Sequence, residues 1–195
     1  MRELSLHLLD LLDNSIRAGA GAVRITIDED PVRNLMRLCV EDDGPGLSVP
    51  AEVALDPFYT TKGGKRTGLG LALLKAAAER AAGQLSLDRS ALGGLRVAVV
   101  VQRDHIDRAP LGDLAATLGS VVCTNPQLDV RCSYTVGEQC FTVASAEVAP
   151  ALGIAEGNEL QAAQSLCRQV QAGLQSIAAG FKTNRGDDRS RQSNG

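Results

Sequence analysis

The 195-residue chain has no tryptophan, and aromatic side chains make up only 3% of it. Hydrophobic residues nevertheless account for 44% and charged residues for 22%, which is typical of a globular chain. This aliphatic content is enough to bury a core, which excludes disorder of the whole chain. We therefore expect a core built from leucine, valine, isoleucine and alanine.

Positive charge is not in excess, because 20 basic side chains stand against 23 acidic ones and the net charge is −3. Nucleic-acid-binding proteins usually carry a basic surface, so nucleic acid is not an expected partner. The sequence has no run of eighteen apolar residues, and it opens on an amphipathic segment that does not resemble a signal peptide. We expect a cytoplasmic protein that does not bind membranes.

The cysteines lack the pattern of a zinc site or a disulfide framework. Their number is odd, and no two form a Cys-x-x-Cys pair. We expect reduced thiols at all five positions, which are Cys39, Cys123, Cys132, Cys140 and Cys167.

Hydrophobic periodicity predicts an α/β fold, a two-layer sandwich with an antiparallel or mixed sheet. In the first half we expect helices over residues 3–17, 50–55 and 70–82 and strands over 22–28, 35–41, 84–88 and 94–101. In the second half we expect a helix over 111–122, a hairpin of strands over 129–136 and 140–144, and a helix over 159–178.

The change of pattern after Asp104 predicts three segments. Residues 1–104 form the main domain, and residues 105–180 form a small α/β element that binds a partner or packs on that domain. Residues 181–195 are polar and are expected to be a disordered tail.

Asp10 and Asn14 are four residues apart on the first predicted helix and therefore share one face. A carboxylate and an amide oxygen placed in this way can order a water molecule and bind Mg²⁺. Taken alone, the pair is more typical of a solvated polar stripe than of a metal site.

The turn after the second predicted strand reads Asp42-Asp43-Gly44-Pro45-Gly46. Gly44 and Gly46 allow the backbone to approach a flat ring closely. The Asp42 carboxylate can accept a hydrogen bond from an exocyclic amine such as N6 of adenine. An acidic glycine turn without a ligand is the alternative interpretation.

A glycine-rich segment precedes the next predicted helix, which opens with Gly68, Leu69, Gly70 and Leu71. Backbone N–H groups at a helix N-terminus favour anions. The loop before it offers hydroxyl groups and cations for phosphate, at Thr60, Thr61, Lys62, Lys65, Arg66 and Thr67. The segment matches neither a Walker A loop nor a Rossmann fingerprint, and a flexible loop without a ligand remains the alternative.

In this order, the motifs over residues 1–104 resemble those of the GHKL superfamily, which includes gyrase, heat-shock chaperone, histidine kinase and mismatch-repair ATPases. The resemblance implies a Bergerat-type ATP-binding fold with ATP and Mg²⁺ as cofactors. It identifies residues 14–20 as the N box and Pro57-Phe58 as the F box.

The resemblance also implies a role for each motif residue. Asp10 would stand at the position of the general base, Asn14 would bind Mg²⁺ and Arg17 would face the phosphates. Asp42 would accept a hydrogen bond from the adenine amine, and Gly44 and Gly46 would lie beneath the base. The remaining nucleotide contacts would come from Phe58, Thr60, Thr61, Lys62, Thr67, Gly68, Leu69, Gly70 and Leu71.

Two departures from the superfamily pattern bear on function. The base position is usually Glu, whereas Asp10 is one methylene shorter, and the lid between Phe58 and Gly68 is short. Neither His7 nor His105 lies in a segment like a phosphoacceptor helix, so neither is an expected phosphoacceptor.

The whole chain resembles small stand-alone bacterial histidine-kinase-like ATP-binding proteins, some of which occur alongside iron hydrogenase subunits. The resemblance implies a regulator that binds ATP or ADP and acts on a protein partner, as a signalling kinase or slow ATPase, with a homodimer as one option for its assembly. A nucleotide sensor without useful turnover and an anti-sigma-like serine kinase are the alternatives.

Overall fold

The computed structural model describes residues 3–56, 69–152 and 158–191, without the side chains of residues 149–152 and 181–191. The strands are β1 Ala22–Asp30, β2 Leu35–Asp42, β3 Gln84–Arg89, β4 Leu95–Gln102, β5 Asp129–Val136 and β6 Gln139–Ala144. The helices are α1 Leu4–Arg17, α2 Ala51–Ala54, α3 Leu69–Arg80, α4 Leu114–Thr124, α5 Ser145–Leu152 and α6 Glu159–Arg191.

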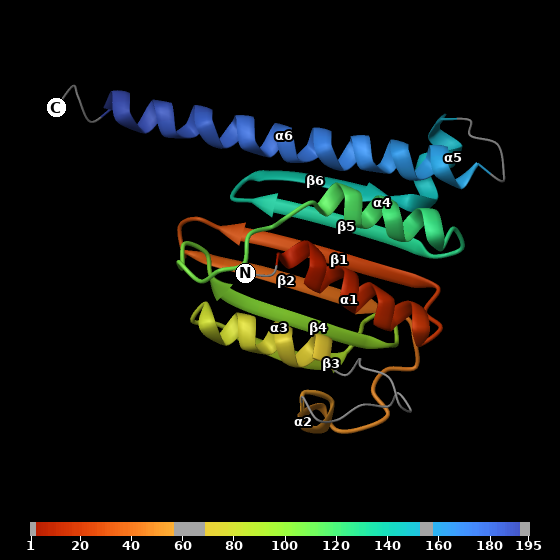
Figure 1. Cartoon of the computed structure of the whole chain (residues 1–195). Coiled ribbons are helices and arrows are strands. Elements are labelled where there is room, and N and C mark those ends of the chain that lie inside the picture. The colour runs from red at the N-terminus through yellow and green to blue at the C-terminus, as the bar shows by residue number, and fades with distance from the viewer. Residues whose placement is uncertain (1–2, 57–68, 153–157, 192–195) are drawn as a thin grey trace.

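All six strands form one mixed sheet in the order β3-β4-β2-β1-β5-β6 (Figure 1). Strands β1 and β5 are parallel, paired from Ala22 with Asp129 to Glu29 with Val136, whereas the other neighbours are antiparallel. The predicted α/β sandwich with a mixed sheet is therefore confirmed.

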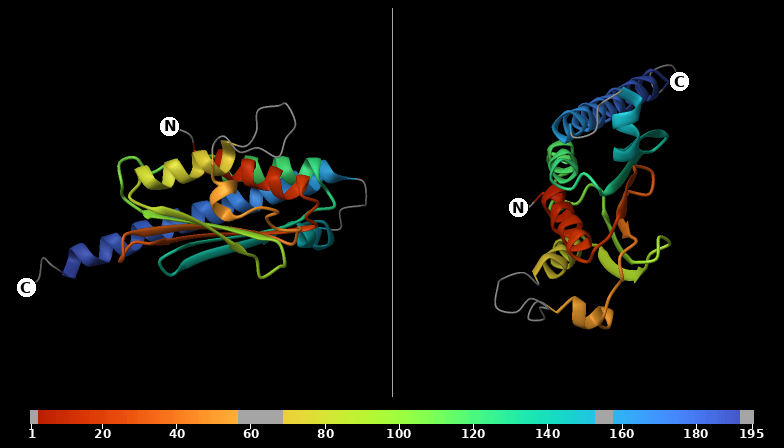
Figure 2. Two further views of the ribbon diagram at one scale, coloured as in Figure 1. Left: turned by 90° about the horizontal axis from the view of Figure 1, so that it is seen from below. Right: turned by 90° about the vertical axis from the view of Figure 1, so that its right-hand side faces the viewer.

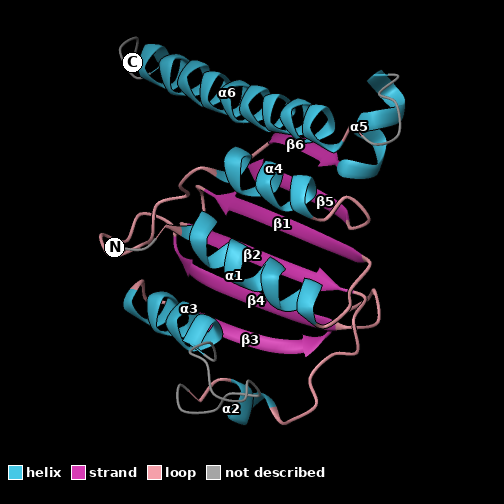
Figure 3. Cartoon of the chain, turned by 45° about the vertical axis from the view of Figure 1, so that its right-hand side comes forward, coloured by secondary structure: helices cyan, strands magenta, loops and turns pink. Residues whose placement is uncertain are grey.

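Four helices lie on one face of the sheet, in the order α3, α1, α4 and α6 (Figures 2 and 3). The alternation along β1 explains this arrangement, because Val23, Ile25 and Ile27 are buried while Arg24 is exposed. Buried aliphatic residues from the strands and from these helices form one hydrophobic cluster. No helix in the described parts of the chain is long and apolar enough to cross a membrane.

The segment after β4 continues the sheet of the first half, because β5 pairs with β1 along eight positions. The predicted hairpin and both predicted helices are present in this segment, and α5 is an addition to them. Helix α5 is short and contains Pro150, so its hydrophobic periodicity does not predict a helix.

Helix α6 continues to Arg191, into the segment for which the sequence predicts a disordered tail. Once packing has nucleated a helix, the helix can extend through a polar stretch that lacks proline. The boundary at Asp104 stays a prediction.

Candidate functional site

Asp42 ends β2 as a buried carboxylate with three protein donors. Its Oδ2 accepts a hydrogen bond from Ser15 Oγ at 2.7 Å, and its Oδ1 accepts from Gly44 N at 3.1 Å and Leu95 N at 3.0 Å. Asp42 is only 5% exposed, and burial of a carboxylate is costly unless such donors are present. The donors fix the carboxylate in one orientation. Because each carboxylate oxygen can accept two hydrogen bonds, Oδ2 retains capacity for a further N–H donor.

Glycines form the walls around this carboxylate. Gly94 N donates to Asp42 O at 3.0 Å, and a Cβ at Gly94 would overlap Asp42 Oδ1 and Gly44 N. Gly46 has a φ of +77° and faces the carbonyl of Gly94, so the turn after β2 needs glycine there. The turn after β2 and the turn before β4 therefore meet at Asp42.

Helix α1 brings Asp10 to the beginning of α3. A Cβ on Gly70 would lie 3.4 Å from Asp10 Cβ and 3.6 Å from its Oδ2. The first turn of α3 therefore lies beside Asp10, close enough that a methyl group at position 70 would contact the carboxylate. Asp10 lies five residues before Ser15, or about 7.5 Å along the helix axis, so α1 links this carboxylate to Asp42.

Asn14 and Arg17 lie on the exposed part of the last turn of α1. The Arg17 guanidinium is 3.8 Å from Asp13 Oδ2, and both side chains are about half exposed, so the pair contributes little to stability. The structure thus places Asp10 and Asn14 one turn apart on α1. It brings Asp42, Gly44 and Gly46 together.

The remaining predicted residues divide into two groups. Leu69, Gly70 and Leu71 form the first turn of α3, where Leu71 packs against the core and Leu69 is exposed. Six others lie outside the described residues, and their roles stay predictions: Phe58, Thr60, Thr61, Lys62, Thr67 and Gly68.

Sequence reasoning missed the residues that hold Asp42 in place. Ser15 lies within the N box, where the sequence suggests no role for it, and Gly93-Gly94 lies at the turn between two predicted strands. Helical spacing is a signal that could find Ser15, because it follows Leu11 and Leu12 by four and three residues and therefore faces the core with them. The contribution of Leu95 N had no signal, since any residue supplies a backbone N–H.

Residues 2–105 match the family described as histidine kinase-, DNA gyrase B- and HSP90-like ATPase. The chain belongs to this family. Membership confirms the resemblance predicted from the motifs, whereas the association with hydrogenases stays a prediction.

Relatives of this ATPase-family chain include proteins named as sensor kinases. It is 37% identical over 111 residues to the sensor protein kinase CarS of Pseudomonas aeruginosa, covering 55% of the chain and 24% of CarS. It is 32% identical over 106 residues to the sensor histidine kinase CpxA of Escherichia coli, covering 49% of the chain and 22% of CpxA. The matched part therefore spans about a quarter of the length of these curated relatives.

Among solved structures, the chain is similar to the ATP-binding domain of PrrB from Mycobacterium tuberculosis. The identity is 28% and the TM-score 0.36, covering 51% of this chain and 67% of the PrrB domain.

Proposed function

We propose that this chain binds ATP together with Mg²⁺ and regulates a protein partner, as a signalling kinase or slow ATPase. The observation that carries the proposal is the buried Asp42 carboxylate, fixed by Ser15, Gly44 and Leu95. Membership of the ATPase family and the names of the sensor kinases among its relatives support the same function.

Asp42 is the group that would recognise the base. An acceptor oxygen held in one orientation favours an exocyclic amine, as in adenine, over the carbonyl oxygen that guanine carries at the same position. The partly exposed glycines Gly44 and Gly46 would allow the ring to approach the backbone. Adenine should therefore be preferred.

The donor set on α1 fits Mg²⁺, which prefers oxygen ligands. Asn14 offers an exposed amide oxygen, and the carboxylate of Asp10 lies one turn earlier on the same face. We assign Asn14 as the ligand and Asp10 as the residue that orients a water molecule. When bound, Mg²⁺ would neutralise phosphate charge.

The phosphates would lie toward the first turn of α3, beside Asp10, because the first N–H groups of a helix have no partner within the helix and favour anions. Arg17 is exposed and its ion pair with Asp13 is long, so its guanidinium can turn toward an anion at small cost. The predicted contacts from Phe58, Thr60, Thr61, Lys62, Thr67 and Gly68, together with Leu69 and Leu71, belong to the same proposal.

Calorimetric titration with ATP, with and without Mg²⁺, tests the proposal on wild type and on Asn14→Ala. Wild type should bind more tightly with Mg²⁺, whereas Asn14→Ala should fold normally and lose that difference. Gln84→Ala removes an exposed amide on the edge strand β3 and is the control, which should retain the difference. The proposal fails if wild type binds no nucleotide at millimolar concentration.

A turnover assay then separates a kinase or ATPase from a sensor that only binds. Phosphate release or transfer to a co-purified protein identifies the former. Transfer to serine in the partner would favour the serine-kinase alternative.

A further inference from the structure

Helix α1 begins without a capping side chain of its own. The first four N–H groups of a helix have no partner within the helix, and the N-cap residue Glu3 makes no side-chain capping bond. Carbonyl groups from the segment between β4 and α4 supply the partners instead. Leu4 N donates to Pro110 O and Ser5 N donates to Leu111 O, both at 2.9 Å.

Gly112 brings this segment, residues 103–113, as close to α1 as a backbone can come. Its φ is +75°, and a Cβ there would overlap Ser5 Oγ and the Glu3 side chain. Two residues later α4 begins, capped by Asp113, whose carboxylate accepts from Ala116 N at 2.9 Å. The start of α1 is therefore held by the segment that leads directly into α4.

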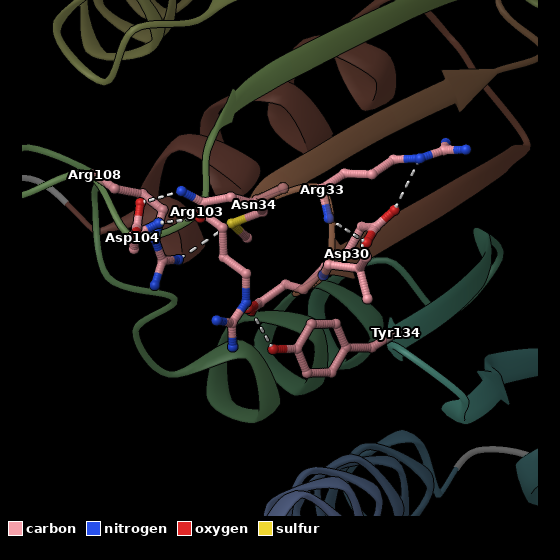
Figure 4. Close-up of polar contacts among 10 residues, drawn as sticks. Asp30, Arg33, Asn34, Arg103, Asp104, Arg108 and Tyr134 are labelled. Atoms are coloured by element: carbon pink, nitrogen blue, oxygen red, sulfur yellow. Dashed lines mark hydrogen bonds and ion pairs between the residues drawn. The ribbon is translucent and has the colours of Figure 1, made fainter.

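The other end of this segment is anchored to the sheet (Figure 4). Arg103 Nε donates to Glu29 Oε2 at 2.7 Å, and Tyr134 Oη donates to Glu29 Oε1 at 2.7 Å. Glu29 is only 6% exposed and belongs to β1, whereas Tyr134 belongs to β5. The segment is consequently fixed at both ends.

Helix α4 contacts both α1 and α6 and lies between them (Figures 1 and 3). Leu114 and Leu118 are buried in the core of these contacts. On the α6 side, Cys167 Sγ lies 3.1 Å from Ala115 O, and a Cβ on Gly119 would overlap that sulfur. A shift of α6 therefore acts on α4, and through α4 on α1, because packed helices have no free space between them.

The far end of α1 carries the proposed nucleotide site. The helix has 14 residues, or about 21 Å, and Ser15 near its C-terminus donates to Asp42. Asp10 and Asn14 lie on the same helix. Any displacement that α4 imposes on α1 thus changes the distance between these side chains and Asp42.

We propose that the C-terminal element, residues 105–180, sets the nucleotide affinity through α1, so that displacement of α4 and α6 is transmitted to the ATP site. The proposal rests on the proposed function, since it assigns the regulation of that site. Coupling between two sites is reciprocal, so ATP must also stabilise α4 and α6. The regulating element contributes β5 and β6 to the sheet that carries Asp42 on β2.

Two measurements on the full chain test the coupling. Gly112→Ala should weaken ATP binding by at least about fivefold, the lower end of typical coupling factors. Gly137→Ala is the matched control, because φ is +58° and the nearest atom to its Cβ is 4.0 Å away, so it introduces backbone strain without overlap. Affinity is measured by calorimetry at a temperature where circular dichroism shows both variants folded.

Hydrogen exchange on wild type, with and without Mg-ATP, is the second measurement and does not depend on any variant. Exchange in α4 and in residues 163–177 of α6 should slow when ATP binds, while exchange in the edge strand β3 should change little. Equal ATP affinity in Gly112→Ala and Gly137→Ala overturns the coupling, as does unchanged exchange in α4 and α6 under saturating ATP. If wild type binds no ATP, it is the proposed function that fails.

Discussion

Ser15 is a residue of the candidate site that no sequence motif singles out and that the structure reveals. Its hydroxyl donates to the buried Asp42 carboxylate, and hydrogen bonds to charged groups contribute about 1.5–3 kcal/mol. Ser15→Ala should lower the free energy of unfolding by that amount in urea denaturation. Ser86→Ala removes an exposed bond to Asp88 and should change stability by less than about 0.5 kcal/mol. Equal effects of the two variants would remove Ser15 from its role.

We predict that Asp10 limits how fast bound ATP is hydrolysed. Its carboxylate reaches about 1.5 Å less far than that of a glutamate, and a misplacement of about 1 Å can reduce a rate by about a hundredfold. Wild type should therefore hydrolyse ATP slowly, Asp10→Glu faster and Asp10→Asn more slowly still, measured as phosphate release. Brisk hydrolysis that survives Asp10→Asn would mean that another group orients the water.

At the scale of elements, the hydrogen bond between Tyr134 of β5 and Glu29 of β1 makes the free energy of unfolding depend on pH. Burial, followed by the hydrogen bond to Glu29, raises the pKa of Tyr134 above the value of about 10 in an unfolded chain. The phenol therefore stabilises the fold below pH 10, and that contribution is lost as pH rises further, because only the unfolded state releases the proton easily.

Tyr134→Phe should accordingly lower the free energy of unfolding by about 1.5–3 kcal/mol at pH 8, since Glu29 loses a donor. The difference from wild type should shrink at pH 11. Urea midpoints at the two pH values measure it, and a difference independent of pH would contradict the assignment.

Local patterns explain which elements were predictable. Alternation along β1 and β2 and the leucine spacing of α1 depend only on neighbours in sequence, and these elements appear within two residues of their predicted ends. The parallel pairing of β1 with β5 joins residues more than a hundred positions apart. No periodicity encodes such a pairing, and the same holds for the contact of Leu95 N with Asp42.

At the scale of the whole molecule, residues 105–195 cover surfaces of the first half that would otherwise be exposed, because β5 pairs with β1 and α4 packs against α1. Removal of residues 105–195 would turn β1 into an edge strand and expose the side of α1 that contacts α4. An exposed apolar edge favours aggregation. The truncated chain should therefore be recovered as aggregated or unfolded protein in size-exclusion chromatography. A monomeric fragment that binds ATP as the full chain does would show that residues 1–104 fold alone.

The central claim, that Asp42 reads adenine, is tested most directly by calorimetric titration of Asp42→Asn with ATP and GTP. The amide oxygen of the Asp42→Asn variant can still accept from the two backbone N–H groups. The amide NH₂ group, however, would face the exocyclic amine of adenine, and two donors cannot form a hydrogen bond with each other. ATP binding should weaken by about 1–3 kcal/mol, with the preference for ATP over GTP reduced. Asp88→Asn, on the exposed face of β3, should bind as wild type does. ATP affinity in Asp42→Asn equal to that of wild type would contradict the account.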